Sequence, residues 1–304
     1  MGVIHVAFCT DEGYGPYTGV AMTSIVLNNI GKEIHFHILA QKINRIDFER
    51  MKNMENLYRN CTVSFYGVDN QRMSSYKTGF HFTTTAYFRW LIPYLLDSSI
   101  DRVLYLDGDV LCTGDIEWIY SSSLDDFPFM AVSSKDDESA GRLCLQNNKL
   151  MNSGELLIDM NMWRKQNVTE RCFKVMEEKG DTFMWVDNDA LNCVADGAFA
   201  AMPDKFCRLI DCAVEQNDCT RGGHSTLHFL GGMKPWKKAC LNINKTIWWS
   251  YARRSLWYDI EPQEPRTLAE VVYLARALSD RGNHEEARKY YEIALKVLSK
   301  EQKS

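Results

Sequence analysis

Apolar and polar positions alternate along the first 66 residues in a way that predicts strands separated by helices. Short apolar runs are typical of buried strands, and apolar residues three or four apart are typical of helices. The expected elements are a strand at 3–9, a helix at 17–29, a strand at 33–39, a helix at 44–59 and a strand at 62–66. This alternation predicts an α/β fold with a largely parallel sheet, helices on both faces and a ligand site beyond the carboxyl ends of the strands.

A second signal is the apolar run at 103–112, which we expect to be a strand carrying Asp107, Gly108 and Asp109. Side chains alternate between the faces of a strand, so the two carboxylates are expected to point the same way, with Gly108 leaving room for a ligand. Paired carboxylates suit Mg²⁺ or Mn²⁺, which often bridge to a substrate phosphate. The alternative is an ordinary Asp-Gly turn after a strand.

Two charged residues upstream of this run are candidates for the same site. Arg89 is the one cation in the mostly apolar segment 86–96, which we expect to be a helix. A buried arginine needs a partner, so Arg89 either pairs with an acidic core residue or faces the site, and we favour the site. Asp11 follows the first strand and is placed to reach a bound base or ribose, the alternative being a solvated acidic loop.

Two downstream segments add small and polar side chains. The polar stretch 133–146 is typical of a loop beside a sheet edge, and we expect it to line the acceptor side. Asn152, Ser153 and Gly154 are expected to lead into a strand at 155–159 and to leave room for a ligand. The alternative for these three residues is a simple turn.

A run of three polar residues, Asp187, Asn188 and Asp189, is expected to open a helix at 190–194. Acidic residues are favoured at helix starts by capping and by the helix dipole. Capping accounts for one of the three side chains. The others are expected to be free to hydrogen-bond the hydroxyl groups of a sugar.

The segment 224–236 completes the candidate metal and phosphate site. His228 can complete a metal shell begun by two carboxylates, whereas we expect His224 to be structural scaffold. Gly231 lets backbone amide groups approach a phosphate, and Lys234 can neutralise a leaving diphosphate.

Composition and charge narrow the class of protein. The net charge of −5 and the isoelectric point near 5.8 argue against a general nucleic-acid binder, which would show a basic patch. No stretch approaches the ~18 apolar residues of a membrane span, and the first ten residues lack a basic leader, so we predict a cytoplasmic protein. The ten cysteines form no Cys-x-x-Cys pair and are expected to be reduced core thiols, with Cys207, Cys212 and Cys219 left unassigned.

The C-terminal region has a different pattern. The aromatic and basic segment 248–258 is expected to pack as a closing helix on the core, the alternative being peripheral contact with a membrane surface. Beyond a proline-containing linker, two helical patterns at 268–278 and 285–295 resemble one tetratricopeptide repeat. A single repeat does not bury its own faces, so this hairpin must dock on the rest of the chain, a second copy or a partner protein. We therefore expect two domains, at 1–258 and 259–304.

Five motifs, in the same order, resemble those of the family 8 glycosyltransferases, which are retaining enzymes of the GT-A (Rossmann-like) fold that use nucleotide sugars. The motifs that carry the resemblance lie at 87–89, 105–110, 152–159, 187–192 and 228–236. The resemblance covers residues 3–257 and implies transfer of galactose or glucose from a UDP-sugar to a sugar hydroxyl. The implied acceptor is a cell-surface glycan or a glycoprotein.

The resemblance also implies roles for individual residues. Asp107, Asp109 and His228 would bind Mn²⁺ or Mg²⁺, and Asp11 would contact the uridine. The other residues implied to bind the donor are Thr10, Tyr14, Arg89, Gly108, Asn152, Ser153, Asp187, Gly231 and Lys234. Those implied to be catalytic are Arg89, Asp187 and Asn188.

Two departures from the family pattern bear on the mechanism. Gly13 stands where relatives often carry an asparagine that touches the ribose, and Asn188 stands where they often carry a glutamine. Neither amide is a convincing covalent nucleophile, which favours a front-face reaction over double displacement.

Two other functions remain open at this point. A metal-dependent nucleotidyltransferase or phosphohydrolase would also use paired aspartates, but it would not explain the segment 228–236. A tetratricopeptide-type adaptor on a degenerate catalytic domain is the non-enzymatic alternative. The intact set of Asp107, Asp109 and His228 argues against that degeneracy.

Overall fold

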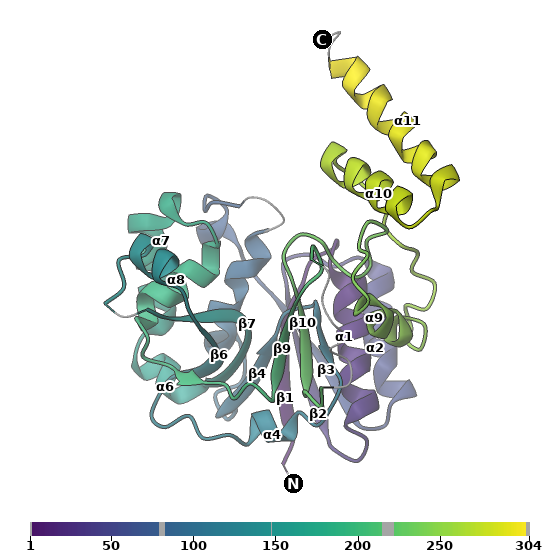
Figure 1. Ribbon diagram of the computed structural model, residues 1–304. Helices are drawn as coiled ribbons and strands as arrows, with labels where there is room; N and C mark the ends of the chain where they lie inside the picture. The colour runs from purple at the N-terminus through teal and green to yellow at the C-terminus, as the bar shows by residue number, and fades with distance from the viewer. Residues whose placement is uncertain (1, 79–82, 147, 215–221, 302–304) are drawn as a thin grey trace.

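A seven-stranded sheet forms the centre of the protein in a computed structural model, which describes residues 2–78, 83–146, 148–214 and 222–301 (Figure 1). Its strand order is β3-β2-β1-β4-β7-β6-β8. Within this sheet, β7 alone is antiparallel to the other described strands. The bounds are β1 (Ile4–Cys9), β2 (Ile34–Ala40), β3 (Cys61–Gly67), β4 (Arg102–Leu106), β6 (Phe129–Lys135), β7 (Lys149–Asp159) and β8 (Ala200–Ala201). The predicted mixed, mainly parallel α/β sheet is therefore confirmed.

A second, three-stranded sheet lies beside the first and brings distant residues together. It consists of β5 (Val110–Cys112), β10 (Thr226–Leu230) and β9 (Cys207–Asp211), with β10 in the middle. β10 runs antiparallel to β5, so that His228 lies opposite Val110. This pairing places His228 next to the turn that precedes β5, although more than 100 residues separate them in sequence.

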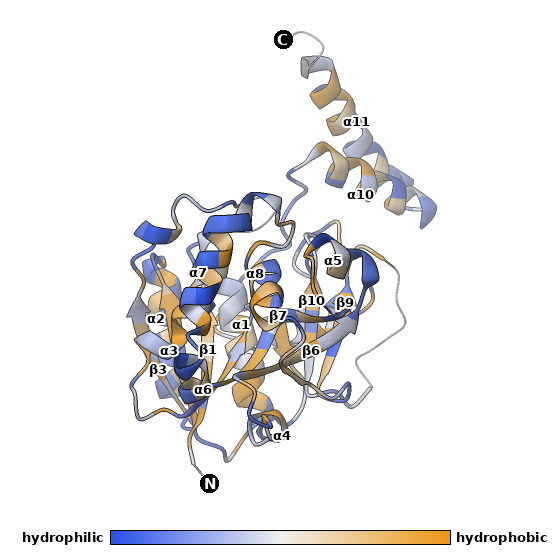
Figure 2. Cartoon of the chain, turned by 90° about the vertical axis from the view of Figure 1, so that its left-hand side faces the viewer, coloured by the Kyte–Doolittle hydropathy of each residue, from blue (hydrophilic) through white to orange (hydrophobic). Residues whose placement is uncertain are grey.

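Helices cover both faces of the large sheet, as the alternation of strands and helices predicts (Figure 1). One apolar core contains α1 (Gly15–Asn28), α2 (Arg45–Leu57) and α9 (Lys245–Ala252). The other contains the 3₁₀ helix η2 (Thr84–Leu91) and helices α3 (Ile92–Leu95), α6 (Met160–Lys165), α7 (Val168–Lys179) and α8 (Val186–Ala195). Along β1, Val6 and Phe8 enter the first core, whereas Ala7 and Cys9 enter the second. Figure 2 shows the hydrophilic outer surface of α7 with hydrophobic strands behind it.

The remaining short helices connect these layers. They are η1 (Gln71–Met73), α4 (Glu117–Tyr120), α5 (Asp137–Arg142) and η3 (Gly180–Thr182). Helix α5 lies within the stretch that the sequence predicts to be a polar loop beside the site.

Two local predictions were wrong, and a third was right only in outline. The run 103–112 is two strands in different sheets, β4 and β5, because the chain turns at Asp107–Asp109, where the Val110 N–H donates to the Asp107 carbonyl oxygen at 3.0 Å. The segment 86–96 is helical, as expected, but it is a 3₁₀ helix followed by one short α-helical turn that contains Pro93 rather than a single α-helix. Asn152 to Gly154 are interior residues of β7 rather than a turn before it, because Asn152 pairs with Val132 of β6.

The aromatic segment after residue 244 closes the first core, in agreement with the favoured interpretation. Trp248, Tyr251 and Trp257 are all buried in that core, and the Trp257 indole N–H donates to Asp47 Oδ1 at 2.6 Å. Among the described residues, no helix combines the length and the apolar character needed to cross a membrane. All described cysteines are free thiols, and Cys219 lies outside the described residues.

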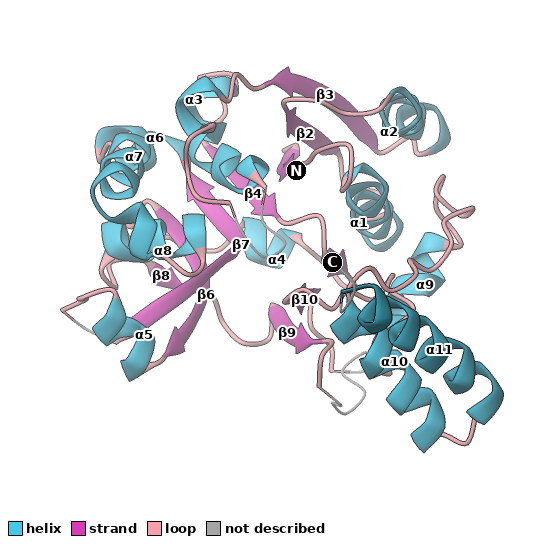
Figure 3. Cartoon of the chain, turned by 90° about the horizontal axis from the view of Figure 1, so that it is seen from above, coloured by secondary structure: helices cyan, strands magenta, loops and turns pink. Residues whose placement is uncertain are grey.

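The C-terminal hairpin consists of α10 (Leu268–Asp280) and α11 (His284–Glu301), which stand outside the α/β body on the side of β9 and β10 (Figures 1 and 3). A small apolar core joins Leu274, Ala275 and Tyr290 of the hairpin to Ala239 of the preceding body. Lys237 and Glu270 add an ion pair at 2.6 Å. The hairpin therefore docks on the rest of the chain, while its resemblance to a tetratricopeptide repeat and a further partner stay predictions.

Helix α1 packs tightly against the aromatic segment at Gly19. We therefore predict that Gly19→Ala will destabilise the protein. A Cβ atom at Gly19 would lie 2.2 Å from the ring of Trp257, so α1 and the aromatic segment would have to separate. Overpacking of this kind costs about 1–3 kcal/mol, which a urea titration will show as a lower unfolding midpoint. Gly141→Ala in α5 is the control, because a Cβ atom there meets nothing within 4 Å, and equal midpoints for both variants would contradict the prediction.

Candidate active site

A cavity of about 750 Å³ opens at the carboxyl ends of β1 and β4, where the fold predicts a ligand site. Most of the predicted site residues line it, namely Asp11, Tyr14, Arg89, Asp107, Gly108, Asp109, Asn152, Ser153, Asp187, Asn188, His228, Gly231 and Lys234. Thr10 differs, because it is fully buried behind the wall, with its Oγ1 atom 2.9 Å from Thr18 Oγ1. His224 is turned elsewhere, and its Nδ1 atom lies 3.1 Å from the Asp204 carbonyl oxygen.

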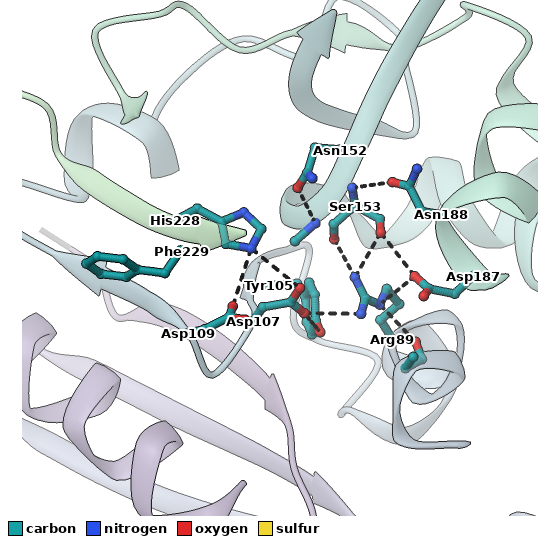
Figure 4. Close-up of polar contacts among 12 residues, drawn as sticks. Arg89, Tyr105, Asp107, Asp109, Asn152, Ser153, Asp187, Asn188, His228 and Phe229 are labelled. Atoms are coloured by element: carbon teal, nitrogen blue, oxygen red, sulfur yellow. Dashed lines mark hydrogen bonds and ion pairs between the residues drawn. The ribbon is translucent and has the colours of Figure 1, made fainter. Parts of the chain in front are cut away.

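Asp107, Asp109 and His228 form the candidate metal centre in this cavity (Figure 4). One ligand atom from each lies within 4.8 Å of the other two. His228 Nε2 is 3.3 Å from Asp109 Oδ1 and 3.9 Å from Asp107 Oδ2. The turn between β4 and β5 supplies both carboxylates, and β10 supplies the imidazole.

The donor set fits a divalent cation. Asp109 Oδ1, which faces His228 Nε2, is buried and has no hydrogen-bond partner among the described residues, which is costly for a carboxylate oxygen that binds nothing. A Cβ atom at Gly154 would lie 2.1 Å from His228 Cε1 and 2.8 Å from Asp107 Oδ2. The missing side chain of Gly154 therefore leaves the space that the two ligands occupy. Two carboxylates and one imidazole are ligands that Mn²⁺ and Mg²⁺ accept.

The second oxygen of Asp109 is already engaged by the protein. Lys234 Nζ donates to Asp109 Oδ2 at 2.5 Å and to the Phe229 carbonyl at 2.6 Å, and the Tyr14 hydroxyl donates to the same carboxylate oxygen at 3.2 Å. Burial alone would raise the pKa of Asp109, but Lys234 and His228 hold it well below its usual range. Asp109 is therefore ionised at neutral pH, with Oδ2 paired to Lys234 and Oδ1 facing the candidate metal position.

Arg89 connects the metal centre to the opposite wall of the cavity (Figure 4). Its Nη2 atom lies 3.1 Å from Asp107 Oδ1 and its Nε atom 3.1 Å from Asp187 Oδ2. Its Nη1 atom donates to the carbonyl oxygen and the hydroxyl of Ser153, at 2.7 and 3.0 Å. Both alternatives for Arg89 hold, because it pairs with the buried carboxylate of Asp187 and the partly exposed carboxylate of Asp107, and it also lines the cavity.

The run 187–189 is more constrained than expected. Asp189 is the capping residue: its Oδ2 atom accepts from the backbone N–H groups of Met184 and Trp185 at 2.8 and 3.0 Å. The prediction that the other two side chains are free was wrong. Asp187 Oδ2 accepts from the Ser153 hydroxyl at 3.0 Å, and Asn188 Oδ1 accepts from the Ser153 N–H at 2.8 Å. These two bonds fasten α8 to β7, because the tertiary pairing brings Ser153 under the start of the helix.

Asp11 is engaged on both of its oxygens. Oδ1 accepts from the backbone N–H groups of Gly13 and Tyr14, each at 3.0 Å. Oδ2 accepts from the hydroxyls of Thr83 and Thr85, at 2.9 and 3.2 Å. This carboxylate therefore joins the loop after β1 to the start of η2, and it lines the cavity from that position.

Several cavity residues were missed by reasoning from the sequence. Arg142 pairs with Asp189 at 2.7 Å, and a cation inside the polar stretch 133–146 was the available signal. Gln263 and Arg266 of the linker also line the cavity, although the expected boundary assigns them to the second domain. The Gln263 N–H donates to the Trp236 carbonyl oxygen at 2.8 Å, a long-range contact that no local pattern indicates.

Glu155 is a second buried acid close to the metal centre. It is fully buried on β7, and neither carboxylate oxygen has a hydrogen-bond partner among the described residues. Burial raises the pKa of Glu155 to about 7, although Thr226 and His228 oppose this shift. The sequence pattern predicted only that Glu155 begins a strand, and it did not indicate that the side chain is buried beside the candidate metal centre.

Known proteins share this fold and family. The galactosyltransferase LgtC, solved with donor and acceptor sugar analogs, superposes with a TM-score of 0.73 at 21% identity, covering 83% of this chain and 96% of that one, and the fold is GT-A. The family model "Glycosyl transferase family 8" matches residues 5–240. The chain therefore belongs to glycosyltransferase family 8, as the resemblance indicates.

Two bacterial relatives align over most of the chain. A protein of Escherichia coli (strain K12) named lipopolysaccharide 1,2-glucosyltransferase is 24% identical over 88% of this chain and 82% of its own length. A protein of Salmonella typhimurium named lipopolysaccharide 1,3-galactosyltransferase is 22% identical over 94% of this chain and 89% of its own length.

We predict that Gly154→Ala will weaken binding of a divalent cation. Its added methyl group overlaps His228 and Asp107, so both ligands must move. Displaced ligand geometry typically costs about 10- to 100-fold in metal affinity, which a Mn²⁺ titration followed by electron paramagnetic resonance will measure. Gly67→Ala at the end of β3 is the matched control, because a Cβ atom there meets nothing within 4 Å. Equal Mn²⁺ affinity in both variants would argue against this geometry.

Glu155 predicts a pH dependence of stability. Its pKa rises from 4.5 in the unfolded chain to about 7 in the fold, so folding retains a proton that the unfolded chain loses as the pH rises. The contribution of Glu155 to the free energy of unfolding is fully present below pH 4.5. It is lost as the pH rises through 7, which lowers the free energy of unfolding by up to about 3 kcal/mol.

Urea unfolding of the wild type and Glu155→Gln across this pH range measures the effect. The wild type should lose stability relative to the variant as the pH rises, while Glu33→Gln, at an exposed position before β2, should follow the wild type. A constant difference between wild type and Glu155→Gln from pH 4.5 to 7.5 would refute the prediction.

Proposed function

We propose that the protein is a retaining hexosyltransferase that moves galactose or glucose from its UDP conjugate to a sugar hydroxyl. The observation that carries this proposal is the group of Asp107, Asp109 and His228 beside Lys234 in one cavity of a family 8 chain. The names of the two bacterial relatives support a hexose donor and a cell-surface glycan as the acceptor.

The metal and phosphate side of the cavity is assigned to the leaving group. Asp107, Asp109 and His228 would hold Mn²⁺, with Mg²⁺ as the alternative. When bound, the ion supplies positive charge that stabilises the departing diphosphate. Lys234 lies 2.5 Å from Asp109 Oδ2 and adds a second cation on the same side. Gly231 has a φ of 72°, which turns the backbone there without a side chain to obstruct a phosphate.

Arg89, Asp187 and Asn188 are assigned to the sugar side. The Asp187 side chain is only 2% exposed and its Oδ2 atom is held by Arg89 and Ser153. Burial raises the pKa of Asp187 to about 6 against the opposing effect of Arg89, so the carboxylate is ionised at neutral pH. A buried, paired carboxylate is a poor nucleophile and a good positioning group, which supports a front-face reaction.

The acceptor is assigned to the wall formed by the polar stretch 133–146. Ser134, Asp136, Ser139 and Arg142 of this stretch line the cavity. Hydroxyl and carboxylate groups at such a wall can hydrogen-bond the hydroxyls of a glycan, while Arg142 is held in place by Asp189.

Release of UDP tests this function directly. The purified protein is incubated with Mn²⁺ and, separately, with UDP-glucose, UDP-galactose and their N-acetyl forms, each with and without EDTA. We expect metal-dependent release from one hexose donor and a loss of at least about 100-fold in Asp109→Asn, because electrostatic stabilisation of the leaving group is removed. Asp126→Asn, at an exposed position outside the cavity, is the control. Release that neither EDTA nor Asp109→Asn reduces would contradict the proposal.

A further inference from the structure

Three histidines gather on the large sheet at the end opposite to the cavity. His5 lies near the start of β1, whereas the cavity opens at its far end, beyond Cys9. His35 and His37 lie two residues apart on β2 and therefore share a face of the sheet. The parallel register of β1 and β2 places His5 directly opposite His35. The fold thus brings three imidazole rings to one patch.

The nitrogen atoms of the three rings converge. One ring nitrogen from each histidine lies within 4.8 Å of the other two, and His5 Nδ1 is 2.9 Å from His37 Nε2. The ring centroids are 4.2 Å apart for His35 and His37 and 5.2 Å apart for His5 and His37. Zinc binds imidazole nitrogen at about 2.0–2.1 Å, so small side-chain rotations would bring all three nitrogens to one ion.

Side chains of β3 already hold the outer nitrogens. His37 Nδ1 lies 2.9 Å from the Tyr66 hydroxyl, and His35 Nε2 lies 2.8 Å from the Ser64 hydroxyl. A metal-bound histidine usually uses its second nitrogen in a hydrogen bond, which fixes the tautomer and the ring orientation. Because these contacts engage His37 Nδ1 and His35 Nε2, the nitrogens left to bind an ion are His37 Nε2 and His35 Nδ1.

The charge state of the cluster also suits a metal. Burial, and then the neighbouring imidazoles, lower the pKa of His37 to about 3, and burial lowers the pKa of His5 and His35 as well. The rings are therefore neutral at physiological pH, and neutral imidazole is the form that binds a metal.

We propose that His5, His35 and His37 form a second metal site, which binds a borderline transition ion of the Zn²⁺, Ni²⁺ or Cu²⁺ class. An all-nitrogen set favours such ions, whereas the oxygen-rich set of Asp107, Asp109 and His228 favours Mn²⁺ or Mg²⁺. Three protein ligands leave a fourth position, and the half-buried rings of His5 and His35 leave it open to solvent. A bound ion would join β1 to β2 and stabilise the sheet independently of glycosyl transfer.

Zinc equivalents per chain test the proposal. The full-length protein is stripped of metal, saturated with Mn²⁺ to fill the oxygen-rich site, and dialysed against micromolar Zn²⁺. Bound zinc is then counted by atomic absorption for the wild type, His35→Gln and the control His284→Gln, which alters an exposed histidine at the start of α11. The wild type and the control should each hold one more equivalent of zinc than His35→Gln.

Thermal unfolding supplies a second readout. Zinc at a hundred-fold excess over its dissociation constant should raise the unfolding midpoint by about 5 °C in the wild type and not in His35→Gln. His5→Gln repeats the test at the neighbouring strand and covers the case in which His35→Gln does not fold. Both histidine variants should release UDP at the wild-type rate with Mn²⁺, which separates this proposal from the proposed function. Equal zinc content in the wild type and either folded variant would overturn the proposal and leave a hydrogen-bonded row of imidazoles.

Discussion

The buried charge of Arg89 is the constraint on which the cavity depends. Arg89 is 5% exposed, and its guanidinium meets Asp107, Asp187 and Ser153, which belong to the turn after β4, to α8 and to β7. A buried cation is tolerated only when its partners surround it, and removal of one partner typically costs about 3–5 kcal/mol. The packing of three elements around the site is therefore coupled to one ionic network.

This network also holds the candidate metal ligands in place before any ligand is bound. The two oxygens of Asp107 point in different directions: Oδ1 accepts from the Tyr105 hydroxyl and pairs with Arg89, whereas Oδ2 faces His228. Asp109 is divided in the same way, because Lys234 contacts Oδ2 whereas Oδ1 faces His228 at the candidate metal position. Charges that are oriented in advance stabilise a leaving group without further reorganisation.

The C-terminal hairpin is linked to this arrangement through the backbone. The backbone of the linker residue Gln263 forms an isolated parallel β-bridge with Lys237, and its N–H donates to the Trp236 carbonyl oxygen. Both partners lie within three residues of Lys234. The hairpin in turn contacts Ala239 and pairs with Lys237 through Glu270. The hairpin and the segment that carries Lys234 are therefore connected by a continuous series of contacts.

Local patterns in the sequence determined much of this protein. Short apolar runs and helical spacing predicted the strands and helices of residues 3–66, and the motifs around Asp107, Asn152 and His228 indicated the family. These features are local because strand and helix periodicities depend on near neighbours. Only the tertiary structure decided that Asp107 and Asp109 lie in a turn between two sheets, that Asp187 and Asn188 are fastened to Ser153, and that His5 meets His37. The physical reason is that these contacts depend on which strands pair and in which register, and pairing is settled by burial across the whole chain rather than by neighbouring residues.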